Sequence, residues 1–236
     1  MSDLYLPSCC TALSDHWPLP LALPGVQLIS TRFDPARLAT GDFDRCGIAA
    51  VKGVAKRQTE YLAGRLCARE ALRRVTGMAA VPAVGADRAP QWPAEVSGSI
   101  THGSGWAAAM VAHASAWRGL GLDVELRLAP ERAERLAGEI LTPGELQQLQ
   151  GLTAEQRAWR ISLSFSFKES LFKALYPQVL QRFYFQDAEL LSCFEDGSAR
   201  LRLLIDLSGD WSAGSELDGQ FVEFDGHLLS LVAIPA

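Results

Sequence analysis

Two short stretches of the 236-residue chain combine side chains that carry charge and protons. The first, Gly-Leu-Asp-Val-Glu, places Asp123 and Glu125 two residues apart. In a β-strand such residues point to the same face, so two carboxylates would lie side by side. Their repulsion is roughly 4 kcal/mol at about 4 Å and an effective dielectric constant of about 20. A divalent cation such as Mg²⁺ would remove it; the alternative is an ordinary solvated strand face.

The second stretch, residues 165–173, reads Phe-Ser-Phe-Lys-Glu-Ser-Leu-Phe-Lys and holds two of the chain's four lysines. In a helix, Glu169 and Lys173 lie one turn apart on the same side, and Lys168 is one position away. The other 18 of the 22 basic residues are arginines, which keep their proton at any relevant pH, whereas lysine can release one. The pair therefore suits proton transfer, with a surface ion pair as the alternative.

A third feature is a local excess of positive charge in a chain whose formal net charge is −5. That net charge argues against a general nucleic-acid binder. Residues 52–88 nevertheless hold three acids and eight cations: Lys52, Lys56, Arg57, Arg65, Arg69, Arg73, Arg74 and Arg88. A small anionic ligand and a solvated helix face explain this excess equally well.

Composition and local motifs exclude several classes of protein. Five scattered cysteines, without a Cys-x-x-Cys pair, argue against a zinc knuckle or a disulfide framework. No stretch reaches the roughly 20 uninterrupted apolar residues that span a bilayer. The first ten residues include Asp3 and lack a basic run, so we expect no signal peptide and a soluble, cytoplasmic protein. His102, in Ser-Ile-Thr-His, has no accompanying nucleophile elbow, which disfavours a hydrolase triad.

The elements that must position these side chains follow from hydrophobic periodicity, which predicts an α+β fold without regular βαβ alternation. Strands are expected over residues 26–30, 96–102, 106–113, 119–125, 199–207, 221–224 and 228–234. Helices are expected over residues 54–75, 130–149 in two pieces, and 158–176, ended by Pro177. Gly103-Ser104-Gly105 and Asp225-Gly226 predict tight turns. We expect an N-terminal half over 1–116 and a C-terminal half over 117–236.

The spacing of these stretches resembles one family. Gly-Leu-Asp-Val-Glu, followed about forty residues later by the 165–173 stretch, is similar to the paired signature of 4′-phosphopantetheinyl transferases of the Sfp/EntD type. Ser-Ile-Thr-His resembles an upstream segment of that family, and Lys56-Arg57, residues 61–65 and Trp92-Pro93 resemble its EntD-like branch. Within the family, the chain looks most like the broad-specificity carrier-protein-activating enzymes of pseudomonads.

The resemblance implies a fold of two similar α/β halves related by pseudo-twofold symmetry, with coenzyme A at their junction. It implies Mg²⁺-dependent transfer of the phosphopantetheine arm of coenzyme A to a serine of an apo acyl- or peptidyl-carrier protein, releasing adenosine 3′,5′-bisphosphate. It further implies a monomer that serves fatty-acid or siderophore biosynthesis and binds neither nucleic acid nor membrane.

The resemblance also implies roles for individual residues. The metal would be held by Asp123, Glu125 and Glu169. Catalysis would involve Asp123, Glu169 and Lys173: Glu169 would take the serine proton, directly or through water, and Lys173 would stabilise or protonate the leaving phosphate. The coenzyme A pocket would be lined by Arg57, Arg88, Ser99, Thr101, His102, Lys168 and Lys173. Of these, Arg57 and His102 would lie near the 3′-phosphate.

Two departures from the family pattern concern this pocket. The family often has Gly-Lys-Pro before its histidine strand, where this chain has Asp87-Arg88-Ala89-Pro90, so Arg88 would supply that charge. Thr101 replaces the usual serine and keeps a hydroxyl.

Two other functions use the same residues: a non-catalytic coenzyme A or nucleotide binder, and a Mg²⁺-dependent phosphohydrolase that uses water. The presence of Glu169 and Lys173 together as base and acid favours transfer, because a passive binder needs neither.

Overall fold

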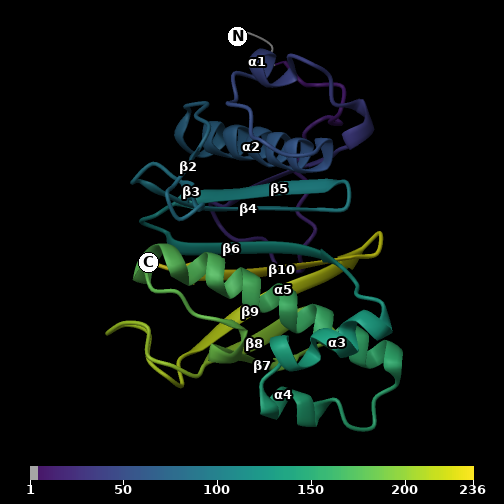
Figure 1. The fold of residues 1–236 in the computed structure, drawn as a ribbon. Helices are drawn as coiled ribbons and strands as arrows, with labels where there is room; N and C mark the ends of the chain where they lie inside the picture. Colours follow the sequence, from purple (N-terminus) through teal and green to yellow (C-terminus); the bar gives the residue numbers. More distant parts are fainter. Residues whose placement is uncertain (1–4) are drawn as a thin grey trace. The chain divides into compact units, whose positions relative to one another are not determined.

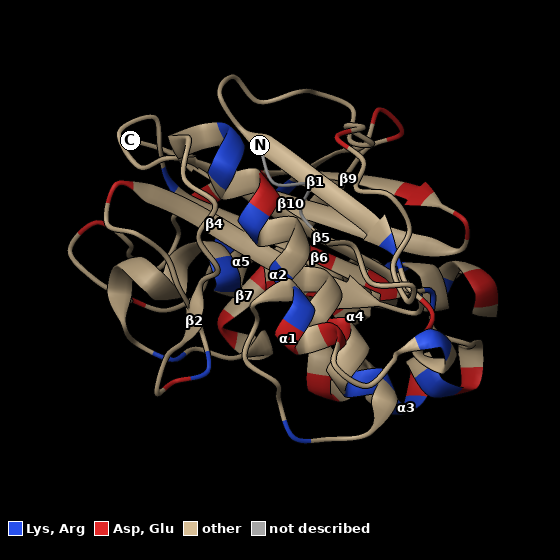
Figure 2. Cartoon of the chain, turned by 90° about the horizontal axis from the view of Figure 1, so that it is seen from above, with Lys and Arg blue, Asp and Glu red and all other residues tan. Residues whose placement is uncertain are grey.

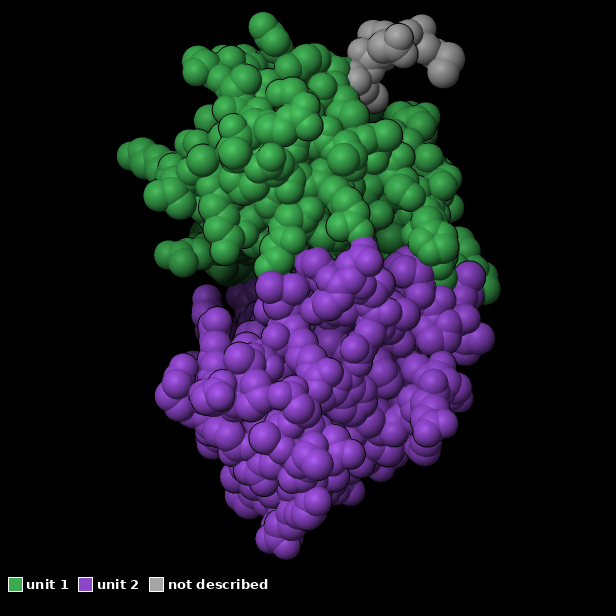
Figure 3. Space-filling view, turned by 90° about the vertical axis from the view of Figure 1, so that its right-hand side faces the viewer, with its two compact units in different colours: residues 1–17, 23–116 green, residues 18–22, 117–236 purple. Residues whose placement is uncertain are grey.

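The structure is a computed structural model that describes residues 5–236, so Asp3 lies outside the described residues. The chain divides into two compact units (Figure 3): residues 1–17 with 23–116, and residues 18–22 with 117–236. Both units combine helices with antiparallel strands, which confirms the expected α+β fold. Among the described residues, no helix is long and apolar enough to cross a membrane.

In the first unit one long helix covers a three-stranded sheet (Figure 1). The strands are β1 (Gln27–Arg32), β4 (Val96–Gly103) and β5 (Trp106–His113), in the antiparallel order β1–β5–β4. The helix, α2 (Ala55–Thr76), buries Leu62, Leu66 and Leu72 against the sheet, as the periodicity predicts. It ends at Gly77, whose φ of +79° is the left-handed conformation that glycine adopts without strain.

The first unit also has four short elements. They are a 3₁₀ turn at Pro35–Arg37, α1 (Asp42–Cys46), β2 (Ala83–Val84) and β3 (Pro90–Gln91). Strands β2 and β3 pair with each other, and the turn between them carries Arg88.

The second unit is a five-stranded antiparallel sheet with helices on it. Its strands are β6 (Trp117–Leu126), β7 (Ala188–Cys193), β8 (Ser198–Leu203), β9 (Glu216–Phe224) and β10 (His227–Pro235), in the order β6–β10–β9–β8–β7. Its helices are α3 (Pro130–Ile140), α4 (Pro143–Gln148), α5 (Ala154–Val179) and a 3₁₀ turn at Phe185–Asp187. Helix α5 packs on β6 and β10, and α3 packs on α5.

Residues 18–22 belong to this second unit although they lie near the N-terminus. The backbone N–H of Leu21 donates to Oε1 of Gln220 on β9 at 2.8 Å. Gly197 leaves room for Pro20, because a Cβ there would stand 2.5 Å from Cγ of Pro20.

Helix α5 differs from its expected bounds at both ends. It begins at Ala154 because Thr153 and Gln156 form a reciprocal capping box, which stabilises four residues more than the periodicity indicated. Pro177 does not end it: proline removes only its own N–H, and the next turn still closes through the N–H of Leu180 and the carbonyl of Tyr176 at 2.8 Å. The expectation that Pro177 terminates the helix is therefore wrong.

The C-terminal strands also differ in part from expectation. Strand β8 stops at Leu203 and β9 begins at Glu216, whereas β7 was not expected at all. A register shift between Leu190 and Ser192 interrupts the alternation of β7 and hides its period of two. The turn before β10 is confirmed, with φ of +48° at Asp225 and +75° at Gly226.

Candidate active site

The paired carboxylates lie on β6, the edge strand of the second unit's sheet. The side chain of Asp123 is buried, with the residue only 4% exposed, and Glu125 is half-buried. Burial raises the pKa of Glu125 to about 7, and the negative charges of Asp123 and Glu169 add to the shift. The structure therefore brings the two stretches singled out in the sequence to one place, where carboxylate charge accumulates.

Helix α5 brings Glu169 and Lys173 to the same strand, one helical turn apart. The ammonium of Lys173 donates to Oδ1 of Asp123 at 2.6 Å and to the carbonyl of Leu122 at 3.0 Å. Burial also raises the pKa of Glu169; Lys173 opposes this shift and Asp123 reinforces it. Lys173 is thus the positive charge that allows the carboxylates to stand together.

The carboxylate oxygens of Asp123, Glu125 and Glu169 decide whether the cluster suits a metal ion. Oδ2 of Asp123 is buried and accepts no hydrogen bond from the described residues. Three carboxylates with an unused buried oxygen are the hard donors that Mg²⁺ prefers. Within residues 5–236, however, no group of three or more His, Cys, Asp or Glu side chains converges as a ready-made metal centre. The donor chemistry fits a divalent cation, and in this structure Lys173 provides the positive charge.

The approach of α5 to β6 depends on glycine and serine. A Cβ at Gly121 would stand 1.8 Å from the carbonyl oxygen of Ser170, so only glycine permits this contact. Beside it, Oγ of Ser230 on β10 lies 2.7 Å from Oγ of Ser166 and 2.8 Å from Oγ of Ser170, and all three residues are fully buried. These small residues fix the depth at which α5 carries Glu169 and Lys173.

Lys168 takes a role that the sequence did not suggest. Its buried ammonium donates to Oε2 of Glu145 at 2.6 Å and to the carbonyls of Ile140 and Phe185 at 2.7 and 2.8 Å. These bonds match the three ammonium hydrogens. Lys168 also lines a small pocket with Glu169, and the coenzyme A contact expected of it stays a prediction. Lys168 ties α5 to the helices that cover the sheet.

A separate group of expected residues meets in the first unit. A pocket of about 360 Å³ is lined there by Arg57, Arg88 and His102 together with Glu60 and Arg65. Nη1 of Arg57 lies 3.3 Å from Nε2 of His102, whose Nδ1 lies 3.8 Å from a carboxylate oxygen of Glu60. Two elements far apart in sequence, α2 and β4, thus form one cationic pocket.

Arg88 reaches this pocket from a strained position. Its φ of +72° is left-handed, which costs a residue with a Cβ roughly 1 kcal/mol or more. The turn holds it through a hydrogen bond of 2.9 Å from its N–H to the carbonyl of Gly85.

Arg65 also lines the pocket, although the sequence pattern placed it only among the cations of residues 52–88, without assigning it to a site. It is 6% exposed, its guanidinium carbon lies 4.9 Å from the ring centre of Tyr61, and its buried Nε has no hydrogen-bond partner in the described chain. The signal was present, since Arg57, Tyr61 and Arg65 recur every four residues on one helix face. The sequence does not show whether this helix face is buried, and the same spacing also fits a face that is exposed to solvent.

Three further cations of α2, Arg69, Arg73 and Arg74, have partners within the chain. Arg69 is buried and donates to the carbonyl of Cys46 at 2.5 Å. Arg73 and Arg74 both bind Glu70. Figure 2 marks the positive charges of α2 in blue. Part of the positive charge of α2 is therefore used within the chain, and the expected anionic ligand at Arg57 stays a prediction.

Ser99 and Thr101 are buried on β4, but neither lines the pocket that holds His102. Successive residues of a strand point to opposite faces, so both lie on the other face from Ile100 and His102. The face of Ile100 and His102, which also includes Gly98, approaches α2: a Cβ at Gly64 of α2 would meet Cγ2 of Ile100 at 2.8 Å. The expected coenzyme A contacts of Ser99 and Thr101 stay predictions.

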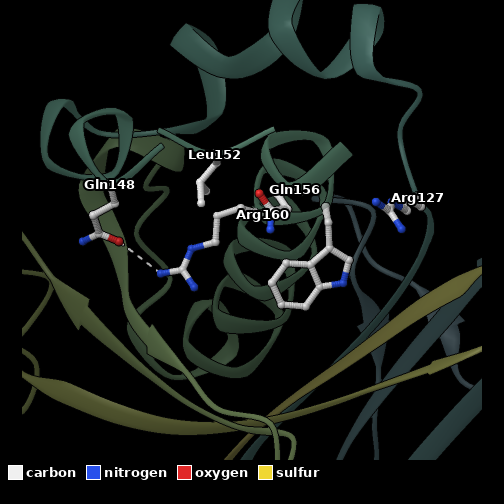
Figure 4. A pocket seen from close by; sticks show the side chains of 6 residues that line it. Arg127, Gln148, Leu152, Gln156 and Arg160 are labelled. Carbon is white, nitrogen blue, oxygen red and sulfur yellow. Dashed lines mark hydrogen bonds between the residues drawn. The ribbon is translucent and has the colours of Figure 1, made fainter. Parts of the chain in front are cut away.

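A larger cavity, of about 410 Å³, lies at the start of α5 and is lined by none of the expected residues (Figure 4). Arg127 and Arg160 lie in its wall with Gln148, and Arg160 donates to Oε1 of Gln148 at 3.1 Å. Size alone therefore does not locate the chemistry of this chain.

Comparison with family models gives two matches. The model of the 4′-phosphopantetheinyl transferase N-terminal domain matches residues 48–112. The model of the 4′-phosphopantetheinyl transferase superfamily matches residues 119–232. Together they cover both the cationic pocket and the carboxylate cluster.

Curated relatives agree with these models. The chain is 40% identical over 163 residues to enterobactin synthase component D of Escherichia coli K12, covering 67% of this chain and 74% of that protein. It is 35% identical to the 4′-phosphopantetheinyl transferase Svp of Streptomyces mobaraensis, covering 78% and 75%. It is 30% identical to the 4′-phosphopantetheinyl transferase Npt of Nocardia iowensis, covering 77% and 84%.

Proposed function

The chain belongs to the 4′-phosphopantetheinyl transferase superfamily and is a transferase of that kind, and from this premise we propose its reaction in detail. It transfers the phosphopantetheine arm of coenzyme A to a serine of an apo acyl- or peptidyl-carrier protein and releases adenosine 3′,5′-bisphosphate. The observation that carries the proposal is the cluster in which Lys173 binds Asp123 beside Glu169 and Glu125.

In this reaction the serine oxygen forms a bond to the β-phosphorus, and the bond from that phosphorus to the bridging oxygen breaks. Glu169 accepts the serine proton, directly or through water; a carboxyl whose pKa is raised is a better base near neutral pH. Lys173 stabilises the negative charge that develops on the leaving phosphate, or protonates it. Its position against Asp123 holds that ammonium in place before the reaction.

Asp123, Glu125 and Glu169 would hold Mg²⁺. When bound, the ion neutralises charge on the pyrophosphate. The buried Oδ2 of Asp123, without a partner in the described chain, supports this assignment.

The cationic pocket of the first unit would bind the 3′-phosphate end of coenzyme A. We expect Arg57 and His102 to contact this phosphate, and Arg88 to supply the charge that the family often takes from lysine. Arg65, which lines the same pocket, would add a further positive charge. Of the arginines in this pocket, Arg65 is buried, whereas Arg57 and Arg88 are exposed. Guanidinium groups are well suited to phosphate because they donate several hydrogen bonds in one plane.

We further propose that the enzyme acts in the cytoplasm as a monomer, without nucleic acid or membrane, on carriers of fatty-acid or siderophore biosynthesis. The similarity to an enterobactin synthase component supports the siderophore part. The motif resemblance to the pseudomonad enzymes supports a broad carrier specificity for this chain.

The proposal predicts that the protein adds one phosphopantetheine to an apo carrier protein. The test is to incubate it with coenzyme A, Mg²⁺ and the carrier and to record the intact mass of the carrier. A carrier whose acceptor serine is replaced by alanine is the control and should gain no mass. Cleavage of coenzyme A with an unmodified carrier would indicate a phosphohydrolase, and an absence of turnover would indicate a binding protein.

Magnesium is expected to raise the melting temperature, and to do so more at high pH. The folded protein raises the pKa of Glu125 from 4.5 to about 7, so ionisation of this group destabilises the fold as pH rises through that interval. A bound cation offsets this effect. At about 100 times its Kd, Mg²⁺ would add about 2.7 kcal/mol, or about 5–10 °C in a chain of this size.

The measurement is a set of thermal melts at about pH 6 and pH 8, with MgCl₂ or with NaCl of equal ionic strength. Asp123→Asn should lose the magnesium-dependent part of the shift. Equal melting temperatures with both salts at both pH values would contradict the assignment of the metal ligands.

A further inference from the structure

The chain segment that follows α5 has an unusual composition for a surface. Between Lys173 and Asp187 the sequence has one charged residue, Arg182. On either side of it, Leu180 is 74% exposed and Tyr184 is 72% exposed. A surface with two large apolar side chains and one cation is typical of a contact with another molecule.

This segment is held rigidly by its inward-facing residues. Phe183 is buried, with its ring centre 5.2 Å from that of Phe172 on α5. Phe185 packs on Phe165 of the same helix, with ring centres 5.3 Å apart. Because both phenylalanines are anchored to α5, Leu180, Arg182 and Tyr184 are presented outward in a fixed arrangement, which lowers the entropy that a contact must lose.

The segment borders the catalytic cluster. A pocket of about 250 Å³ is lined by Glu169 and Phe172 on α5, and by Arg182, Phe183 and Tyr184. Any protein that presents a serine hydroxyl to Glu169 from the solvent side of this pocket therefore meets Arg182 and Tyr184. The exposed Leu180 precedes Arg182 by two residues.

The positive charge of Arg182 indicates that the partner protein has an acidic surface. Arg182 is exposed and makes no ion pair within residues 5–236, in contrast to Arg157, which binds Glu134 at 2.6 Å. In a chain of net charge −5, an acidic partner would be repelled by much of the surface and attracted here.

We propose that Leu180, Arg182 and Tyr184 form the docking edge for the acceptor protein. Leu180 and Tyr184 contact its apolar side chains, and Arg182 pairs with a carboxylate close to the acceptor serine. The inference rests on the proposed transferase function, because that function supplies a macromolecular partner whose serine must reach Glu169.

The cavity at the start of α5 is a poorer docking place, although it contains two arginines (Figure 4). Arg127 donates to the carbonyl of Glu155 at 2.8 Å, and Arg160 binds Gln148 and Sγ of Cys193. These cations are engaged within the chain, and none of the proposed catalytic residues lines that cavity.

The test compares Arg182→Glu with Arg135→Glu, a matched change at an exposed arginine of α3 that also makes no ion pair in the described residues. With purified apo acyl carrier protein, Arg182→Glu should raise the KM for the carrier at least about tenfold, which is about 1.4 kcal/mol. The KM for coenzyme A should stay within about twofold, and Arg135→Glu should resemble the wild type.

Binding gives a readout that does not depend on transfer. The Kd of the carrier, measured by calorimetry without coenzyme A, should weaken by the same factor in Arg182→Glu, and Tyr184→Ala should weaken it through lost apolar contact. A carrier with its carboxylate nearest the acceptor serine changed to lysine should regain affinity for Arg182→Glu. An inactive wild type that still binds the carrier through Arg182 would refute the transfer reaction alone.

The docking edge would be refuted by an unchanged carrier Kd and KM in Arg182→Glu. It would also be refuted by equal losses in Arg182→Glu and Arg135→Glu, since these would reflect net charge rather than a local contact. A wild-type protein that binds no carrier would refute it as well.

Discussion

Glu169→Gln is expected to lower the turnover number of phosphopantetheine transfer by about 10²–10⁴-fold, the usual contribution of a positioned base. Glutamine has nearly the same shape as glutamate but cannot accept the serine proton. The pKa of Glu169 is raised by burial, which matches a base that must act near neutral pH. The measurement is kcat from the rate of mass gain of the carrier, with the Kd for coenzyme A from calorimetry, which should change little.

Glu131→Gln is the matched control, because Glu131 is an exposed carboxylate in the first turn of α3. It should keep the wild-type turnover number. Wild-type turnover in Glu169→Gln would show that the carboxylate is not the base. Recovery of turnover at high Mg²⁺ concentration would show that Glu169 serves the metal ion alone.

Gly121→Ala is expected to destabilise the protein by about 3 kcal/mol or more, at the upper end of what overpacking costs. The added Cβ would stand 1.8 Å from the carbonyl oxygen of Ser170 and 2.8 Å from the backbone nitrogen of Ala174. These are helix backbone atoms, so α5 as a whole must move away from β6. Because α5 carries Lys173 and β6 carries Asp123, transfer activity should fall as well.

The measurement is urea unfolding, together with kcat at a temperature where the variant is fully folded. Gly138→Ala is the control: a Cβ at this helical position meets nothing within 4 Å. It should stabilise the protein by about 0.5–1 kcal/mol, since alanine loses less entropy than glycine in a helix. If Gly121→Ala were as stable as the wild type, the contact between α5 and β6 would not limit the site.

The sequence was sufficient to predict most of the elements, and the exceptions have local causes. Helix α2 shows a clear apolar stripe and a glycine stop, and the structure reproduces it within one residue at each end. Strand β7 was not predictable, because its register shift at Leu190 breaks the alternation that identifies a strand. Proline at position 177 disfavours a helix on average, but here the hydrogen bond from the N–H of Leu180 to the carbonyl of Tyr176 maintains the last turn.

Within the site, spacing sufficed where two residues act from the same element. Asp123 with Glu125, and Glu169 with Lys173, follow from the periods of a strand and a helix. Lys168 shows the limit of such reasoning: it precedes Glu169 by one residue, which turns its side chain about 100° around the helix axis. Only the positions of Glu145 and Phe185, set by the tertiary fold, show that this lysine is used internally.

Because residues 18–22 belong to the second unit, a protein fragment that contains only that unit cannot be made by a single cut in the chain. A fragment that starts at Trp117 would contain all five strands of that sheet and the Asp123–Lys173 pair. It would nevertheless leave uncovered the places where Leu21 binds Gln220 and Pro20 fills the space beside Gly197. The two units are therefore not two consecutive modules that a single crossover could exchange. A fragment that isolates the second unit needs residues 18–22 joined to residues 117–236.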